Sequence, residues 1–282
     1  MALARPVAIV FAPTGMVPTR AMTPHVPLTP KEVARDVQLA SELGITSVHL
    51  HARDDDGKPT WSRERYAELV GEVRSRVPDV VVNVSTSGRT WPDLERRSSV
   101  LKLSGDLKPD VASLTTSSLN FIDGTSVNEP AVIRGLASIM RDHGIVPELE
   151  IFDFGMINFA LVLRKEGLVP GPFLANLFFG NVAGMQATLG EIGLAVDRLP
   201  SDAHWCGAGL GSFQFTAQAH AITAGGGVRV GLEDGIYFDR ERTRLATNIE
   251  LLERVHRMVE LSGRTVMTPG QFRRDVLMRT ES

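Results

Sequence analysis

Cysteine is nearly absent from this sequence, since Cys206 is the only one among 282 residues. A single cysteine cannot form a disulfide within the chain, which excludes the small secreted proteins that disulfides hold together. The composition therefore agrees with the reducing environment of the cytoplasm. Glycine and proline together make up about 15% of the chain, short of the roughly 25–30% typical of low-complexity disorder. A disordered or fibrous protein is excluded.

The sequence also lacks an excess of positive charge. Thirty Lys and Arg residues against 33 Asp and Glu residues give a formal net charge of −3, so no basic surface is expected to attract nucleic acid or an anionic membrane. The long uncharged stretch 167–190 is interrupted by prolines and asparagines and lacks the roughly 20 apolar residues of a spanning helix. The apolar run 7–12 is short for a signal peptide, and we interpret it as a first strand.

Short apolar runs alternate with longer amphipathic segments along the whole chain, which is typical of repeated βα units around a parallel sheet. The predicted strands are 7–11, 47–51, 80–85, 111–114, 146–151, 173–178, 204–206 and 227–230. The predicted helices are 33–43 with its cap at Thr29, 62–76, 93–103, 128–143, 158–165, 188–199, 213–224 and 240–261.

Eight such units without a linker predict an α/β fold, a single (β/α)8 TIM-barrel domain over 1–282 with a short C-terminal extension, about 263–282. A doubly wound open sheet is the main alternative. Its G-x-G-x-x-G motif after the first strand is missing here.

Two histidines, His49 and His51, lie at the end of the second predicted strand. Alternate residues of a strand share a face, so both imidazoles point the same way and can bind one divalent metal ion. Zinc or another borderline ion is the expected metal, since imidazole suits several of them. A hydrogen-bonded pair without metal is the alternative, and the spacing alone leaves both open.

An arginine and two acids, Arg229, Glu233 and Asp234, follow at the end of the last predicted strand. The C-terminal ends of all TIM-barrel strands meet at one face, where active sites are built, so Glu233 can reach the histidines. A third ligand of this kind leaves one zinc position open, as in catalytic sites. Asp234 beside Arg229 is a candidate base, because a neighbouring cation favours the carboxylate. A surface ion pair with a helix-capping acid is the alternative.

Further polar side chains lie at other predicted strand ends. Ser85 ends the third strand, Ser113 and Thr115 lie at the end of the fourth, and Glu148 and Glu150 share a face of the fifth. Two acids in an apolar strand are costly to bury without a partner, so we expect one to face the barrel mouth. Each group alone is more often turn or capping chemistry, and their common placement is what indicates a site.

The chain also resembles a known family along essentially its whole length. The matching segments are Thr14-Gly15-Met16, Leu28-Thr29-Pro30-Lys31-Glu32, His49-Leu50-His51-Ala52-Arg53 with Asp56-Gly57, Asn83-Val84-Ser85-Thr86, Ser118-Leu119-Asn120-Phe121, Pro147-Glu148-Leu149-Glu150 with Gly155-Met156, 228–234, Ser262-Gly263-Arg264 and Thr268-Pro269. On these residues the chain resembles the β-keto acid cleavage enzymes, a family that includes the 3-keto-5-aminohexanoate cleavage enzymes. The combination of segments is specific, although no single one is.

This resemblance implies a zinc-dependent barrel that converts a β-keto acid and acetyl-CoA into acetoacetate and a new acyl-CoA. By the same resemblance, His49, His51 and Glu233 are the zinc ligands, and Asp234 with Arg229 is the deprotonating pair. A Lewis acid of this kind would stabilise the enolate that such chemistry requires. The residues implied to hold substrate or intermediates are Ser85, Ser113 and Glu150.

Two substrate-binding positions depart from the aminohexanoate enzymes. Val17 stands where they have a glutamate placed to receive the substrate ammonium, and an apolar residue leaves a buried ammonium unpaired. Thr115 stands where they have an asparagine, which changes the hydrogen-bonding groups of the pocket. We therefore expect the same reaction on a β-keto acid with a less cationic tail.

A metal-dependent amidohydrolase is the second hypothesis, because that class also combines H-x-H and a late acid in a barrel. It carries H-x-H on the first strand, whereas a strand and a helix precede His49 here. A barrel that binds a metal or metabolite without catalysis is the third hypothesis. Small molecules are the expected partners, and the resemblance implies a homo-oligomer, either a dimer or a tetramer.

Overall fold

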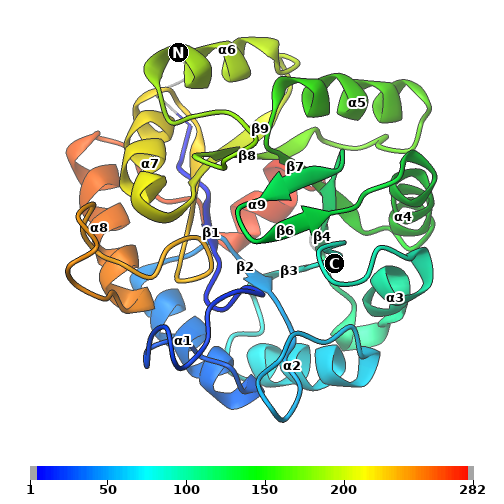
Figure 1. The fold of residues 1–282 in the computed structure, drawn as a ribbon, viewed down its shortest axis with the longest axis horizontal. Coiled ribbons are helices and arrows are strands. Elements are labelled where there is room, and N and C mark those ends of the chain that lie inside the picture. Colours follow the sequence, from blue (N-terminus) through cyan, green and yellow to red (C-terminus); the bar gives the residue numbers. More distant parts are fainter. Residues whose placement is uncertain (1–4, 279–282) are drawn as a thin grey trace.

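The computed structural model describes residues 5–278, so the ends of the predicted domain, 1–4 and 279–282, lie outside the described residues. Eight parallel strands close into a barrel in the order β1-β10-β9-β8-β7-β4-β3-β2, with helices around it (Figure 1). The predicted TIM barrel is confirmed. The barrel strands are β1 (Ile9–Phe11), β2 (Ser47–Leu50), β3 (Val81–Val84), β4 (Val111–Thr115), β7 (Val146–Ile151), β8 (Leu174–Phe179), β9 (His204–Gly209) and β10 (Gly227–Val230).

Helices follow the strands and cover the outside of the barrel. None of the helices in residues 5–278 is both long and apolar enough to cross a membrane. Most begin at a capping residue, as at Thr29, whose side chain and that of Glu32 form a capping box. The helices are α1 (Pro30–Leu43), α2 (Arg63–Arg76), α3 (Leu94–Ser98), α4 (Pro130–Asp142), α5 (Phe154–Lys165), α6 (Leu189–Arg198), α7 (Gln214–Thr223), α8 (Asn248–Leu261) and α9 (Pro269–Asp275).

Two predicted helices begin elsewhere in the structure. The helix predicted from residue 240 begins only at Asn248, so its first turns were predicted wrongly. Thr247 caps α8, and the Asp239 carboxylate accepts backbone hydrogen bonds that form a turn before it. The helix predicted from residue 158 begins earlier, at Phe154, because Asp153 caps it.

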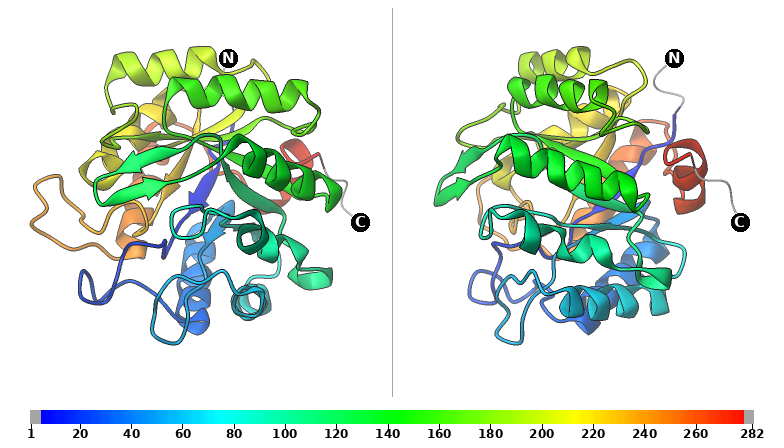
Figure 2. Two further views of the ribbon diagram at one scale, coloured as in Figure 1. Left: turned by 45° about the vertical axis from the view of Figure 1, so that its right-hand side comes forward. Right: turned by 90° about the vertical axis from the view of Figure 1, so that its right-hand side faces the viewer.

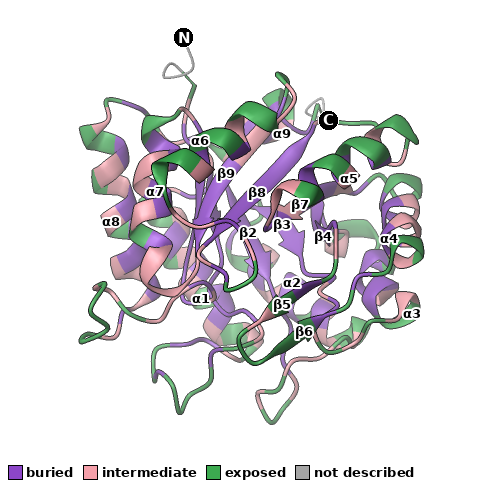
Figure 3. Ribbon diagram, turned by 45° about the horizontal axis from the view of Figure 1, so that its top comes forward, coloured by how far each residue is buried: buried purple, intermediate pink, exposed green. Residues whose placement is uncertain are grey.

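The barrel strands are buried on both faces, whereas the outer faces of the helices are exposed (Figure 3). This is the usual state of parallel strands covered by helices. Val48 and Leu50 of β2 belong to the main hydrophobic cluster. The alternate residues of this segment, His49 and His51, bring their side chains together, as the strand period predicts.

Closure of the barrel places the earliest and latest strands side by side. β1 lies between β2 and β10, where Phe11 pairs with Val48 on one side and with Val230 on the other. The histidines follow Val48 and the acids follow Val230. Residues from opposite ends of the sequence therefore reach the same edge of the barrel.

Two additions cover opposite ends of the barrel. An antiparallel hairpin, β5 (Leu119–Phe121) with β6 (Gly124–Ser126), follows β4 and is not apparent in the sequence pattern. In the side views it lies at the end opposite to α9 (Figure 2). At that other end, Phe272 of α9 belongs to a hydrophobic cluster with the strand residue Leu174. The hairpin is therefore the addition that stands at the mouth of the barrel, where the candidate site lies.

Candidate active site

Three potential metal ligands meet at the carboxyl ends of β2 and β10. His49 Nε2 lies 3.0 Å from His51 Nε2, and His51 Nε2 lies 3.0 Å from Glu233 Oε1. His49 Nε2 is 3.9 Å from the same carboxylate oxygen. Ligand atoms of the three residues all lie within 4.8 Å of one another. One ion can therefore contact all three residues that the sequence analysis selected.

The protonation states of two of these side chains, His49 and Glu233, suit a metal ion. Burial, together with the nearby Arg229 cation, holds the pKa of His49 well below its usual range, so the imidazole is neutral and has a free lone pair. Burial by itself raises the pKa of Glu233, but the Arg229 cation holds it well below the usual value. His49 Nδ1 and Glu233 Oε2 have no hydrogen-bond partner among the described residues. Two imidazoles and a carboxylate are a donor set of catalytic zinc sites, and these residues fit such an ion.

A glycine allows the loop after β1 to reach this cluster. Gly15 has a φ of +67°, and a Cβ there would lie 2.5 Å from Glu233 Cγ. The Arg53 guanidinium fixes the loop by donating to Gly15 O from Nε at 3.1 Å and from Nη2 at 2.6 Å. Any other residue would meet backbone strain and displace the carboxylate. The same loop carries Val17.

Arg229 connects the metal cluster to the candidate base. It is only 1% exposed, and its Nη2 lies 2.6 Å from Glu233 Oε1 while its Nε donates to Asp234 Oδ2 at 3.0 Å. Its guanidinium carbon lies 5.2 Å from the centre of the Phe178 ring. Nη1 has no hydrogen-bond partner within the described chain. That free N–H group, on a residue that lines a pocket, can bind a ligand oxygen.

The pKa of Asp234 departs from the expectation that a neighbouring cation favours its carboxylate. Burial is the largest influence and raises this pKa to about 6, against the opposing attraction of Arg229. A carboxylate that titrates this close to neutral pH is a stronger base than an exposed aspartate and is still largely ionised at pH 7. Asp234 is therefore suited to accept a proton.

His51, Arg229, Glu233 and Asp234 line one pocket of about 620 Å³ at the barrel mouth. His49 is fully buried and is not part of its lining. Four residues predicted to hold substrate or to act on it also line the pocket, namely Val17, Ser85, Thr115 and Glu150. Thr115 Oγ1 donates to Glu150 Oε2 at 2.7 Å, which orients that carboxylate. Val17 is 46% exposed and presents no charged group to the pocket.

Two other predicted polar residues lie behind this lining. Ser113 is fully buried, and its Oγ accepts a hydrogen bond from the backbone N–H of Thr86. It holds the loop after β3 in place and lines neither of the two pockets at the barrel mouth, and its contact with substrate stays a prediction. Glu148 is also buried and accepts from Asn83 Nδ2 at 2.6 Å, and burial raises its pKa to about 7. Glu150 is the acid of this strand that lines the pocket.

The loop after β3 and the hairpin contribute pocket residues that the sequence analysis missed. Arg89 and Phe121 line the pocket, and the guanidinium carbon of Arg89 lies 3.7 Å from the centre of the Phe121 ring. Phe152 and Phe178 stack on each other with their centres 4.4 Å apart. No motif marks Arg89 in the sequence, because its importance depends on where the hairpin folds.

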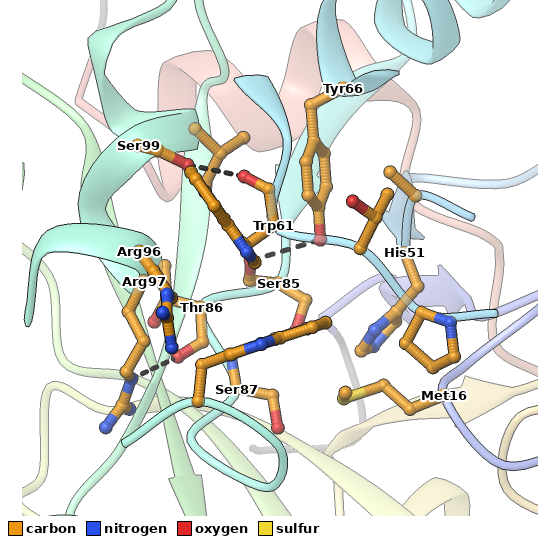
Figure 4. A pocket seen from close by; sticks show the side chains of 15 residues that line it. Met16, His51, Trp61, Tyr66, Ser85, Thr86, Ser87, Arg96, Arg97 and Ser99 are labelled. Carbon is orange, nitrogen blue, oxygen red and sulfur yellow. Dashed lines mark hydrogen bonds between the residues drawn. The ribbon is translucent and has the colours of Figure 1, made fainter. Parts of the chain in front are cut away.

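A second pocket of about 380 Å³ joins the first at His51 and Ser85. Figure 4 shows His51 and Tyr66 on one side of it and Arg97 on the other. The Tyr66 hydroxyl donates to the backbone oxygen of Ser85 at 3.4 Å. Trp61 also lines this pocket and is 43% exposed. Because both pockets reach His51, two molecules can approach the metal cluster from different directions.

The fold and this site define a TIM-barrel protein with a candidate metal cluster and base at the carboxyl ends of its strands. A family model described as beta-keto acid cleavage enzyme matches residues 6–277. The chain belongs to the β-keto acid cleavage enzyme family, which confirms the resemblance seen in the sequence.

Several relatives are similar over nearly the full length. A 3-keto-5-aminohexanoate cleavage enzyme of Fusobacterium nucleatum is 35% identical over 94% of this chain and 95% of its own. A 3-oxoadipate:acetyl-CoA acetyltransferase of Cupriavidus necator is 34% identical over 96% of this chain and 94% of its own. The solved apo structure of ObcA has a TM-score of 0.80 at 22% identity, which supports the fold alone. The match covers 90% of this chain but only 65% of the longer ObcA chain.

Proposed function

We propose that this protein is a zinc-dependent enzyme that converts a β-keto acid and acetyl-CoA into acetoacetate and a new acyl-CoA. The observation that carries the proposal is the convergence of three potential ligands, His49, His51 and Glu233. Two of them, His51 and Glu233, line the same pocket as Asp234. Carbon–carbon bond chemistry on a β-keto acid needs an electrophile and a base at the same substrate. The 3-oxoadipate:acetyl-CoA acetyltransferase relative supports acetyl-CoA as the second substrate.

The residues of the site have separate tasks in this reaction. His49, His51 and Glu233 would hold zinc, which when bound supplies Lewis-acid polarisation of the keto and carboxylate oxygens. Asp234 takes the proton from the carbon between the two carbonyl groups, and the hydrogen bond from Arg229 Nε orients its carboxylate. The free Nη1 of Arg229 stabilises the negative charge that develops on substrate oxygen.

Acyl exchange then follows in two steps. The enolate carbon attacks the thioester carbonyl of acetyl-CoA, so that a carbon–carbon bond forms and the CoA thiolate leaves. The thiolate attacks the original keto carbon, and the bond from that carbon to the central carbon breaks. The released acetoacetate carbanion takes the proton back from Asp234, which restores the base. Glu150 and Ser85 line the pocket beside Asp234 and hold the substrate.

The two joined pockets support a reaction between two substrates. The keto acid occupies the larger pocket, which contains Asp234 and Arg229. The thioester arm approaches His51 through the smaller pocket, whose lining includes Trp61 and Tyr66. Val17 lines the larger pocket where the aminohexanoate enzymes have a glutamate. Because an apolar side chain cannot pair with a substrate ammonium, this residue supports a keto acid without a cationic tail.

A substrate screen tests this function. Zinc-loaded protein is incubated with acetyl-CoA and a panel of β-keto acids, and acetoacetate is measured. We expect product from at least one keto acid and none without the thioester. Hydrolysis without any thioester would favour the amidohydrolase alternative, which the position of His49 on the second barrel strand already weakens. No acetoacetate from any keto acid would overturn the proposal. The homo-oligomer and the cytoplasmic location stay predictions.

A further inference from the structure

Arg89 places a positive charge in the larger pocket and is not one of the residues assigned to the reaction. It lies in the loop after β3, and its guanidinium covers the ring of Phe121 on the hairpin at 3.7 Å. It lines the same pocket as Glu233 and Asp234. Stacking on an aromatic ring orients the guanidinium plane but leaves its edge N–H groups free.

Those N–H groups have no partner in the described part of the chain. The backbone N–H of Arg89 donates to Ser87 Oγ, but no hydrogen bond or ion pair of its side chain is found within residues 5–278. By contrast, Arg97 in the adjoining pocket donates to Thr86 O at 2.7 Å and to Asn128 Oδ1 at 2.8 Å. Two nitrogens of Arg97 are thus bonded to the chain and, among the described residues, only its Nη1 lacks a partner, whereas no donor of the Arg89 side chain is engaged.

The two acids that attract Arg89 electrostatically, Glu233 and Asp123, form no ion pair with it among the described residues. Glu233 is engaged by Arg229 and His51. Asp123 lies in the exposed hairpin turn and attracts Arg89 without forming an ion pair. A partly buried cation with free donors is stabilised most by an anion that accepts two hydrogen bonds, such as a carboxylate. The three carboxylates that line this pocket, those of Glu150, Glu233 and Asp234, form no hydrogen bond or ion pair with Arg89 among the described residues.

We propose that Arg89 selects β-keto acids that carry a second carboxylate at the end distal to the reacting keto acid group. This inference rests on the proposed function. A 3-oxo dicarboxylate would place its reacting end near Asp234 and Arg229 and its distal carboxylate on the edge of Arg89. A neutral tail leaves the Arg89 donors without a partner, and a cationic tail is repelled.

The test compares two six-carbon substrates that differ only at the tail: 3-oxoadipate, which ends in a second carboxylate, and 3-oxohexanoate, which ends in an uncharged methyl group. The ratio of their kcat/KM values is measured with acetyl-CoA in the unchanged protein and in Arg89→Met, which keeps the chain length but removes the charge. Hydrogen bonds to a charged group contribute about 1.5–3 kcal/mol, so we expect the preference for 3-oxoadipate to fall about 10- to 100-fold. Arg198→Met is the matched control, because Arg198 also covers a phenylalanine ring, that of Phe154, but lies outside both pockets.

The phosphates of CoA are the other anions that Arg89 can bind. Acetyl-N-acetylcysteamine is a thioester without phosphates. Replacing acetyl-CoA with it distinguishes binding of the distal carboxylate from binding of the CoA phosphates. If Arg89 binds the distal carboxylate, the change in substrate ratio persists with the short thioester. If Arg89→Met raises only the KM for acetyl-CoA and leaves the ratio unchanged, the inference is overturned.

A binding measurement keeps this test independent of turnover. Calorimetry is carried out with adipate and hexanoate, neither of which can react. We expect the unchanged protein to bind adipate more tightly than hexanoate, and Arg89→Met to bind the two acids equally. Equal binding of both acids by the unchanged protein would contradict the role of Arg89. Selective adipate binding with no acetoacetate from any keto acid would instead refute the proposed function and leave the Arg89 site standing.

Discussion

The backbone of Gly15 packs directly against the side chain of Glu233, leaving no room for a Cβ between them. A Cβ at position 15 would lie 2.5 Å from Glu233 Cγ and 2.9 Å from its Cβ. The loop after the first strand is thus in contact with the last of the three potential metal ligands. The position of the Glu233 carboxylate therefore depends on Gly15, a residue that has no side chain to take part in binding or catalysis.

Gly15→Ala is expected to weaken zinc binding. The alanine adopts a left-handed backbone conformation at a cost of about 1–2 kcal/mol and pushes the Glu233 carboxylate away from His51. Zinc affinity measured by calorimetry should fall, together with the melting temperature. Gly167→Ala is the control, because Gly167 has a similar φ of +71° with nothing within 4 Å of the added Cβ. Equal zinc affinity in both variants would contradict the contact.

Removal of a histidine ligand should release the metal. His51→Gln keeps a polar side chain but removes the imidazole nitrogen that lies 3.0 Å from Glu233 Oε1. We expect zinc affinity to fall by more than about 100-fold, since even outer-shell partners of a ligand contribute 10–100-fold. Metal content by atomic emission is the measurement. His220→Gln on α7, a histidine that bonds Thr216 O, should retain the zinc of the unchanged protein, and a His51→Gln protein with full zinc content would refute this ligand.

Asp234→Asn should nearly abolish turnover while leaving zinc in place. Asparagine has the same shape but cannot accept the substrate proton, and general base catalysis contributes about 10²–10⁴-fold. We expect kcat to fall by that order with little change in the melting temperature. The exposed Asp197→Asn on α6 serves as control. Normal turnover of Asp234→Asn with normal zinc content would show that another group is the base.

The buried acid Glu148 should make stability depend on pH. Burial raises its pKa from 4.5 to about 7 in the folded protein, so the folded state binds this proton more tightly than the unfolded chain does. The free energy of unfolding therefore decreases as pH rises from about 4.5 to 7, and the full loss is present above pH 7. At about 1.4 kcal/mol per pKa unit, the ionisation of Glu148 lowers the free energy of unfolding by up to about 3 kcal/mol.

Glu148→Gln isolates that contribution. Glutamine keeps the oxygen that accepts from Asn83 Nδ2 but does not titrate, so the variant should gain stability relative to the unchanged protein between pH 5.5 and pH 8. Urea unfolding at these two pH values is the measurement. The exposed Glu241→Gln should follow the unchanged protein. An identical pH dependence in Glu148→Gln would mean that the buried carboxyl is ionised throughout.

The core of the site could be predicted because its features are local. His49 and His51 share a face through the two-residue period of a strand, and Glu233 is followed directly by Asp234 at a strand end. The number of βα units then predicts a closed barrel, in which the first and last strands become neighbours. The start of α8 was misjudged because the charged segment before it continues the helical pattern, while the Asp239 turn competes with helix formation.

The sequence by itself determined the βα repeat and the pairing of the two histidines, because both follow from backbone periodicity. It also determined the adjacency of the potential metal ligand Glu233 and the candidate base Asp234, because the two residues are consecutive. Only the tertiary structure decided that Ser113 is turned to Thr86, that Arg89 faces the pocket over Phe121, and that burial outweighs Arg229 at Asp234. The physical reason is that burial and unpaired polar groups depend on which segments close over a side chain and exclude water from it. The segments that pack over one side chain come from distant parts of the sequence, so a local sequence pattern cannot predict which side chains become buried.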